Sequence, residues 1–262
     1  MGVLNVTPDS FSDGGRFADH DAALRQAESM AAGGAQIIDV GGESTRPGAQ
    51  AVSEQQELDR VLPVIEGIRE ILDVPVSVDT SKPAVMRAAV AAGAVLVNDV
   101  FALRLPGALE AVADLGCPAC LMHMQGKPRT MQDDPRYDDV VADVTAFLEA
   151  RVAECVAAGI ERDHLIVDPG FGFGKRPEHN VRLLAGLPAL CRIGCPVLIG
   201  VSRKATLGHL TGRDVEDRLP ASIAAAVLAV TQGAQIVRAH DVGATVDALR
   251  IARAVMDQEG RA

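Results

Sequence analysis

Residues 74–99 read VPVSVDTSKPAVMRAAVAAGAVLVND, and this stretch contains one complete repeating unit of the fold. Its two apolar runs, VPVSVDT and AVLVND, are mostly continuous rather than alternating with polar residues, which is typical of parallel strands covered by helices. Between them, Pro83 suits the first turn of a helix, where a backbone N–H has no helical partner in any case. The stretch therefore predicts a strand, a helix and a second strand, with Asp79 and Asn98 at the strand ends.

The same unit recurs along the chain. Six further apolar runs predict strands, and they read MGVLNV, AQIIDV, PACLMHM, LIVDPG, PVLIGVS and AQIVRAHD. Helical patterns are expected over residues 24–31, after the capping-box pair Ser53 and Gln56, over 105–115, 138–159 and 179–190, after Pro220, and over 243–257. Eight such units predict an α/β fold, a (β/α)8 TIM barrel, as a single domain over residues 1–262.

An open, doubly wound sheet is the alternative architecture. However, no GxGxxG sequence follows the first strand, and GFGFGK at residues 170–175 has the spacing of neither a dinucleotide loop nor a Walker loop. The chain also has no low-complexity segment or linker between domains. The barrel is therefore the favoured fold.

Composition excludes several classes of function. The net charge is −10 and the longest basic run is Ser202-Arg203-Lys204, so nucleic-acid binding is not expected. No apolar stretch reaches the roughly 20 residues that span a bilayer, so no membrane association is expected. Five scattered cysteines, with Cys117 and Cys120 expected to be a buried, reduced pair, and no visible signal peptide predict a cytoplasmic protein.

Polar residues follow nearly every predicted strand, where the carboxyl ends of barrel strands converge on one mouth. They are Asn5, Asp39, Asp79, Asn98, His123, Asp168, Ser202, and Arg238 with His240. Structural explanations exist for single members of the set: Asp39 could brace the next turn, and His123 could be a hydrogen-bonded core histidine. Asp79 could cap the next helix, whereas Asn98 and Asp168 could stabilise turns. An unpaired buried carboxylate is costly, so the whole set together points to a ligand.

The chemistry of these groups indicates what the ligand carries. Asp79, Asn98 and Asp168 suit a flat heterocycle with adjacent N–H groups, because an ionised carboxylate accepts two parallel hydrogen bonds. Opposite them, positive charge is expected at Arg203, Lys204, Arg238 and His240, which together with the hydroxyl of Thr45 suit a phosphate-bearing arm. The ligand implied is an amidic ring with an anionic arm.

Eight blocks, in this order, resemble the signature motifs of the bacterial dihydropteroate synthase family of pterin-binding enzymes. They read MGVLNVTPDSFSDGG, IIDVGGESTRPGA, SVDTSKPAV, LVNDV, LMHMQGKPRTMQ, VDPGFGFGK, GVSRKA and VRAHDV, and the resemblance runs from residue 1 to about residue 255. The resemblance implies a homodimeric transferase of folate biosynthesis. It condenses (7,8-dihydropterin-6-yl)methyl diphosphate with 4-aminobenzoate, giving 7,8-dihydropteroate and pyrophosphate.

The resemblance also implies roles for individual residues. The pterin diphosphate would contact Thr45, Asp79, Asn98, Met122, Asp168, Lys204, Arg238 and His240, with Val100 beside Met122, and the last three of the eight contacts would be catalytic. The 4-aminobenzoate pocket would comprise Phe11, Arg46, Pro47, Phe173 and Ala205, with alanine at 205 where some members have serine. Mg²⁺ would be held by Asn5 and by Asp13, which lies in TPDSFSDGG, a segment expected to act as a lid.

Two other functions remain open at this point. Methyltetrahydrofolate-using methyltransferase domains share the barrel and the pterin slot, although they need neither TPDSFSDGG nor STRPGA. A non-catalytic relative that binds a pterin or regulates a partner is the alternative from another class. Release of pyrophosphate would distinguish the synthase from both of these alternatives.

Overall fold

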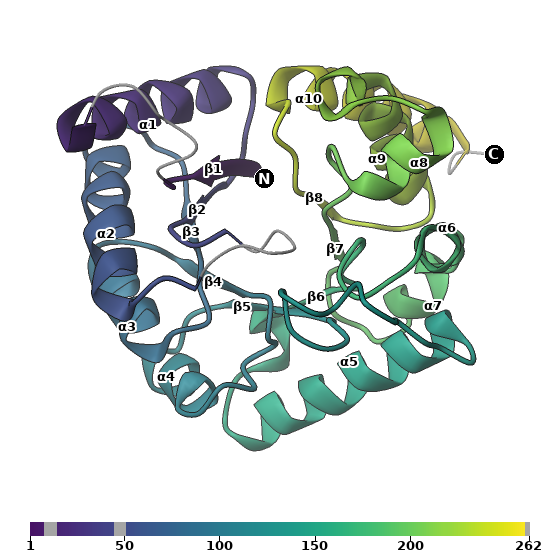
Figure 1. Ribbon diagram of the computed structural model, residues 1–262, viewed down its shortest axis with the longest axis horizontal. Helices are drawn as coiled ribbons and strands as arrows, with labels where there is room; N and C mark the ends of the chain where they lie inside the picture. The colour runs from purple at the N-terminus through teal and green to yellow at the C-terminus, as the bar shows by residue number, and fades with distance from the viewer. Residues whose placement is uncertain (8–14, 45–50, 260–262) are drawn as a thin grey trace.

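Eight parallel strands form a ring at the centre of the structure, a computed structural model that describes residues 1–7, 15–44 and 51–259, and helices surround this ring (Figure 1). The strands are β1 Gly2–Asn5, β2 Ile38–Gly41, β3 Val76–Asp79, β4 Leu96–Asp99, β5 Ala119–Met122, β6 Leu165–Asp168, β7 Leu198–Ile199 and β8 Ile236–Val237. β1 to β6 pair in sequence order, and β7 pairs with β8.

Helices follow the strands and cover their outer face (Figure 1). They are α1 Gly15–Ala32, α2 Glu54–Ile71, α3 Pro83–Ala91, α4 Ala108–Leu115, α5 Val140–Ala157, α6 Pro177–Ala185, α7 Leu187–Cys191, α8 Ala205–Thr211, α9 Leu219–Thr231 and α10 Val242–Glu259, with short 3-10 turns at Arg162–His164 and Val215–Asp217. Among the described residues, none of the helices has the length and apolarity that crossing a membrane requires.

Isolated bridges close the ring at the two places where the sheets meet. Val167 of β6 pairs with Val197, and Gly2 of β1 pairs with Ala239, just beyond β8. The second junction also has main-chain hydrogen bonds from Val3 N to Ala239 O (3.1 Å) and from Ala239 N to Met1 O (3.0 Å). First and last strands are therefore joined, and the prediction of a (β/α)8 barrel is confirmed.

Strand alternation divides the interior into two parts. Ile38 and Val40 of β2 and Val76 and Val78 of β3 belong to the apolar core that packs under the helices. Successive side chains of a strand point to opposite faces, so the residues between them point toward the barrel axis. In β2 and β3 these residues include Asp39, Ser77 and Asp79, all of which are buried. The fold therefore places charged side chains inside the barrel.

Most predicted helices are present, with two differences. The helix expected over 179–190 is two helices, α6 and α7, which meet at Gly186. A Cβ on Gly186 would lie 2.6 Å from the side chain of Val141, so this close approach to α5 requires glycine. The short helix α8 was not predicted. The capping box of α2 is confirmed, with Ser53 N donating to Gln56 Oε1 at 3.0 Å.

Candidate active site

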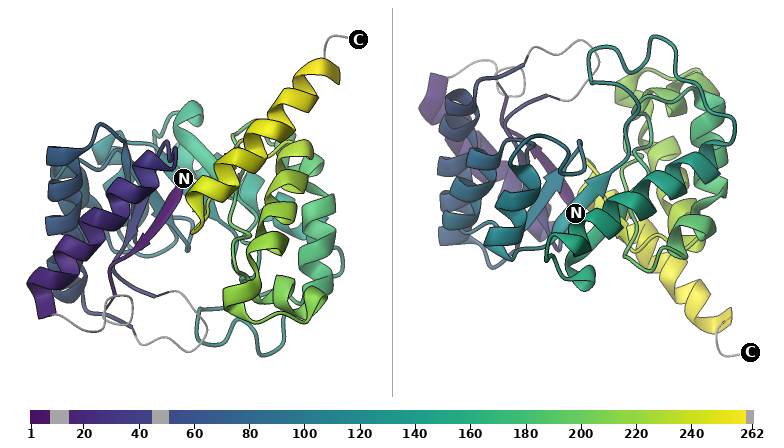
Figure 2. Two further views of the ribbon diagram at one scale, coloured as in Figure 1. Left: turned by 90° about the horizontal axis from the view of Figure 1, so that it is seen from above. Right: turned by 90° about the horizontal axis from the view of Figure 1, so that it is seen from below.

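The predicted ligand-binding side chains lie at the carboxyl ends of the strands. Asn5, Asp79 and Asp168 are the last residues of β1, β3 and β6, and Asn98 pairs in register with Asp79. The long segment 123–139 after β5 lies at the same end of the barrel (Figure 2). These residues therefore share the mouth of the barrel, as the sequence predicts.

Arg238 connects the last strand to the second and third strands across the inside of the barrel. Its Nε donates to Asp39 Oδ2 at 2.6 Å and its Nη2 donates to Asp79 Oδ2 at 2.8 Å. Asp39 Oδ2 also accepts a hydrogen bond from Asn98 Nδ2 at 3.0 Å. Three strands besides β8 thus supply groups to one buried network. Such charge-assisted bonds fix the planar guanidinium in one orientation.

Asp39 is the residue of this network that the sequence left undecided. It does not brace a turn, because it lies within β2, two residues before the strand ends at Gly41, and it is fully buried. Its partner Arg238 is 199 residues away in the chain. A carboxylate inside the apolar run IIDV was the available signal, since a buried charge of this kind requires a cation beside it.

Burial and neighbouring charges shift the pKa values of Asp79 and Arg238 in opposite directions. Burial raises the pKa of Asp79 to about 7, and the guanidinium of Arg238 opposes this shift. Burial disfavours the charged form of Arg238, but Asp39 and Asp79 together raise the pKa of Arg238 above its ordinary value. Arg238 therefore stays charged, and its two carboxylates are the reason.

Asp168 is held by the main chain of the loop that follows it. Its Oδ1 accepts from the N–H of Gly170 at 2.7 Å, and the residue is buried. Burial raises the pKa of Asp168, whereas this hydrogen bond and the nearby ammonium groups of Lys204 and Lys175 lower it. A turn role, the alternative to the predicted ligand-binding role of Asp168, accounts for the hydrogen bond from Gly170 but not for the nearby positive charges.

Lys204 and an apolar cluster form the other wall of the mouth. The Nζ of Lys204 lies 4.0 Å from the centroid of the Phe173 ring, a cation–π contact. Phe173 packs, together with Phe101, against a cluster of buried residues, and these are Val100, Met122, Met124 and Met131. Met122 and Val100 were predicted for the pterin and Phe173 for 4-aminobenzoate. The structure brings them onto one continuous apolar surface.

His240 differs from its prediction in charge. Its Nδ1 lies 3.0 Å from Ser202 Oγ, and burial, followed by the charges of Arg238 and Arg203, lowers its pKa to about 4. The imidazole is therefore neutral at pH 7, whereas a positive group was expected. The charge of Arg203 is also compensated within the protein, because its guanidinium forms an ion pair with Asp241 at 2.5 Å. Positive charge at the mouth is thus concentrated on Arg238 and Lys204.

His123 is a hydrogen-bonded buried histidine. Its Nδ1 lies 2.9 Å from the Nζ of Lys175, and its ring packs edge-on against Phe147 at 4.8 Å between centroids. The ring nitrogen facing an ammonium must be the acceptor, which fixes the proton of neutral His123 on Nε2. These contacts support the explanation that His123 is a hydrogen-bonded core histidine.

The remaining predicted site residues are placed as follows. Asn5 lies next to Asp79: a Cβ added to Gly41 would be 3.7 Å from Asn5 Oδ1 and 3.6 Å from Asp79 Oδ2. Ala205 is the first residue of α8, where a backbone N–H has no acceptor within the helix. Outside the described residues lie Phe11, Asp13, Thr45, Arg46 and Pro47.

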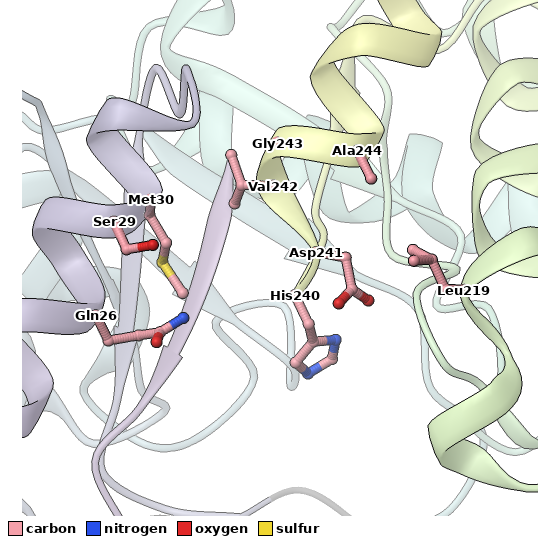
Figure 3. Close-up of a pocket in the computed structure, with 9 residues that line it drawn as sticks. All are labelled: Gln26, Ser29, Met30, Leu219, His240, Asp241, Val242, Gly243 and Ala244. Atoms are coloured by element: carbon pink, nitrogen blue, oxygen red, sulfur yellow. The ribbon is translucent and has the colours of Figure 1, made fainter.

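A cavity of about 310 Å³ opens between α1 and the first residues of α9 and α10 (Figure 3). His240 and Asp241 line it together with Gln26 and Ser29. Among the described residues that were predicted to contact the pterin diphosphate, His240 alone lines this cavity. The cavity is therefore beside the proposed ligand site rather than the site itself.

Potential metal ligands gather elsewhere in the described part of the chain. There, the group of three side chains close enough to share one ion is Glu161, Asp163 and His164, just before β6 and thus at the opposite end of this strand from Asp168. Two of them are exposed, and exposed acidic groups of this kind are common without an ion. At the mouth, the described side chains with oxygen atoms that could bind a metal include Asn5, Asp79 and Asp168.

The chain belongs to the pterin-binding enzymes, because the family model described as "Pterin binding enzyme" matches residues 1–240. A parallel barrel with buried acids, an amide and cations at one mouth is consistent with this class. Among relatives, dihydropteroate synthase of Haemophilus influenzae is 54% identical over 251 residues, covering 96% of this chain and 91% of the relative. Within the pterin-binding enzymes, the chain is a member of the dihydropteroate synthase family, as the motifs predict.

Solved structures agree in fold. A dihydropteroate synthase of Xanthomonas albilineans with 4-aminobenzoic acid has a TM-score of 0.93 and 56% identity, covering 98% of this chain and 92% of the other. The same synthase in complex with 7,8-dihydropteroate has a TM-score of 0.90 and 52% identity over the same shares of both chains. These values establish the fold over almost the whole length of both proteins.

Replacing His123 should change how stability depends on pH. Burial, followed by the charge of Lys175, lowers the pKa of His123 to about 2, compared with an ordinary value of 6.5. Because the folded state resists protonation, this residue contributes stability above pH 6.5 that is lost as the pH falls, by about 1.4 kcal/mol per pH unit. In urea unfolding, the stability gap between wild type and His123→Asn should narrow by about 2 kcal/mol from pH 7 to pH 5. A gap that stays constant would contradict a buried, neutral His123.

Proposed function

We propose that the mouth of this barrel carries out the dihydropteroate synthase reaction. The observation that carries this is the convergence of Asp79, Asn98 and Asp168 from three strands with Arg238 and Lys204 beside them. Acceptors on one side suit the N–H edge of a pterin, and cations on the other suit its diphosphate. The relatives named dihydropteroate synthase, together with the structure of one in complex with 7,8-dihydropteroate, support the assignment.

The network prepares Asn98 to recognise the ring. Since Asn98 donates from Nδ2 to Asp39, its Oδ1 is the atom left to face a ligand, where it accepts from a ring N–H. Asp79 and Asp168 add carboxylate acceptors, and Met122 supplies an apolar face for the flat ring. Lys204, lying near Asp168, is placed to donate to a ring carbonyl or nitrogen. Recognition thus combines fixed acceptors with one donor.

Bond breaking requires stabilisation of the departing diphosphate. As the bond between the pterin methylene and the diphosphate oxygen breaks, negative charge grows on the diphosphate and positive charge on the pterin methylene. Arg238 and Lys204 would stabilise the negative charge on the diphosphate. Asp79 and Asp168 would stabilise the positive charge on the pterin methylene. His240, neutral before binding, can donate from Nε2 if Nδ1 accepts from Ser202. The amine of 4-aminobenzoate then attacks the methylene carbon and loses a proton.

Mg²⁺ fits the described donor set. Magnesium prefers oxygen ligands and usually keeps several waters while binding substrate phosphates. Asn5 offers an amide oxygen beside Asp79 at the mouth, and Asp13, outside the described residues, would add a carboxylate. The ion would supply charge neutralisation for the diphosphate.

The second substrate would lie over Phe173, which forms the described part of its predicted pocket. Lys204 contacts this ring, and its charge acts on Asp168, which supports a position for Lys204 beside both substrates. The N–H of Ala205, at the start of α8, is positioned to receive a carboxylate without a serine hydroxyl. Phe11, Arg46 and Pro47 would complete this pocket.

The direct test is turnover by the purified protein. With (7,8-dihydropterin-6-yl)methyl diphosphate, labelled 4-aminobenzoate and Mg²⁺, we expect dihydropteroate and pyrophosphate in equal amounts, and chelation with EDTA should stop the reaction. Pterin binding without pyrophosphate release would instead favour a non-catalytic relative. Methyl transfer from methyltetrahydrofolate would favour the methyltransferase class.

Asp168→Asn should lose most pterin affinity. The substitution replaces an ionised two-oxygen acceptor by an amide with one acceptor, and a hydrogen bond to a charged group contributes about 1.5–3 kcal/mol. We expect the Kd to rise roughly 10- to 150-fold in calorimetric titration. Asp163→Asn, an exposed acid at the other end of β6, is the matched control and should bind as the wild type does. Unchanged binding by Asp168→Asn would remove this residue from the site.

A homodimer and a cytoplasmic location complete the proposal. Exposed apolar side chains gather on neighbouring elements of one side of the barrel: Val181 on α6, Leu210 on α8, and Leu228 on α9. Exposed apolar side chains on helices that contact one another suit an interface between two copies of the chain. All five cysteines are free, as expected for a reducing compartment, and the predicted pair Cys117 and Cys120 is buried.

Leu228→Asp should separate the two chains. A carboxylate on this side chain, 53% exposed in the single chain, would be desolvated in an interface between copies. Light scattering should give the mass of two chains for the wild type and of one chain for the variant at equal concentration. Ile71→Asp, on α2 and 49% exposed, is the control and should remain dimeric. A monomeric wild type, or a dimeric Leu228→Asp, would contradict the interface.

A further inference from the structure

Lys175 is a buried lysine that the reaction described above does not use. Burial lowers its pKa to about 7, and the carboxylate of Asp168 opposes this shift, so the side chain is an ammonium on the acid side of pH 7. Lys175 ends the motif VDPGFGFGK, and its side chain is 2% exposed. Its Nζ lies 2.9 Å from Phe173 O, 3.0 Å from Gly170 O and 3.3 Å from His123 O, in addition to 2.9 Å from the His123 ring nitrogen. An ammonium has three protons, so these four acceptors surround it completely. Lys175 therefore joins the end of β5 to two points of the loop after β6.

The loop that Lys175 holds can fold only around glycines. Gly170, Gly172 and Gly174 have φ values of +67°, +85° and +61°. A Cβ on Gly170 would lie 1.9 Å from His123 O, so the chain passes directly over β5 at this point. These backbone angles turn the carbonyls of Gly170 and Phe173 toward the ammonium. The side chain of Phe173 packs on the apolar cluster of the mouth instead.

Gly170 links Lys175 to the carboxylate of Asp168. Its carbonyl accepts from Lys175 Nζ at 3.0 Å, while its N–H donates to Asp168 Oδ1 at 2.7 Å. Releasing the carbonyl would loosen the same residue that orients the carboxylate. The path from the lysine to a proposed ligand-binding atom therefore contains a single residue.

Lys175 also acts on Asp168 through its positive charge. The charged and titratable groups that face Asp168 are the ammonium groups of Lys204 and Lys175, the guanidinium of Arg238, and the thiol of Cys120. The first three are cations that favour an ionised carboxylate against the effect of burial. Lys204 and Arg238 lie at the mouth, where a ligand can occupy their donors. Lys175 lies beneath the loop, where its bonds are all to the protein.

We propose that Lys175 is a positioning residue for pterin binding: it fixes the loop that presents Asp168 and Phe173, and it keeps Asp168 ionised from the protein side. This role presupposes the proposed function, since the ligand is the pterin. A direct catalytic role does not fit the geometry, because the ammonium is enclosed by its acceptors and has no face toward the mouth. His123 belongs to the same arrangement as the neutral acceptor.

The test is the pH dependence of pterin affinity. Binding of 6-hydroxymethyl-7,8-dihydropterin would be measured by calorimetry from pH 5 to pH 9 for the wild type, Lys175→Met, Lys175→Gln and Lys175→Arg. Affinity falls at acid pH as the ring-binding carboxylates Asp79 and Asp168 become protonated. Lys175 acts on Asp168 and is not among the charges that act on Asp79, so a difference in midpoint between a Lys175 variant and the wild type reports the ionisation of Asp168. Removing a nearby positive charge raises the pKa of a carboxylate. Lys127→Met, an exposed lysine of the neighbouring segment 123–139, is the matched control.

The two neutral variants should move the midpoint upward, so that the loss of affinity relative to the wild type is several-fold larger at pH 6, where Lys175 is protonated, than at pH 8, where it is largely neutral. Lys175→Arg, which keeps the charge, and Lys127→Met should keep the wild-type midpoint. Lys175→Gln, whose amide still donates to the carbonyls, provides the neutral variant if Lys175→Met does not fold.

A purely structural role predicts a different result. Affinity would then fall by the same factor at every pH, with the midpoint unchanged in the neutral variants, and this outcome would overturn the inference alone. A wild type that binds the dihydropterin at no pH would overturn the proposed function and the inference together.

Discussion

The guanidinium of Arg238, held between Asp39 and Asp79, is the interaction on which the rest of the site depends. It crosses the inside of the barrel from the last strand to the second and third strands, and through Asp39 it also orients Asn98. Desolvating three charges costs several kcal/mol each before their attraction is counted. Removing one partner leaves a buried charge uncompensated, at a typical cost of about 3–5 kcal/mol. A network of this kind is therefore better explained by the geometry it imposes than by net stability.

That geometry separates acceptors from donors at the mouth. Because Arg238 pairs with both carboxylates, Asp39 and Asp79 can be buried on neighbouring strands without a large excess of negative charge. His240 is neutral before a ligand arrives, and Arg203 is paired with Asp241. Lys204, another cation at this rim, contacts the ring of Phe173, a residue of the proposed 4-aminobenzoate pocket. Beneath the loop after β6, Lys175 supplies charge that no ligand displaces.

Sequence alone predicts the parts of the structure that follow from local pattern. Continuous apolar runs locate the strands, and the rule that barrel strands present their ends at one mouth locates Asp79, Asn98 and Asp168. The break at Gly186 was missed because it depends on contact with Val141 of α5, which helical periodicity does not encode. Asp39 stayed undecided because its partner lies 199 residues away. The neutral state of His240 follows from burial, and the surroundings of Lys175 consist largely of main-chain carbonyls. Neither feature can therefore be predicted from the types of residue in the sequence.

The most direct measurement is a crystal structure of the protein with 6-hydroxymethyl-7,8-dihydropterin. We expect ring nitrogens within about 2.7–3.2 Å of Asp79, Asn98 Oδ1 and Asp168, with Arg238 still bonded to Asp39 behind them. A ring bound elsewhere in the barrel, or these three side chains turned away from the ligand, would contradict it.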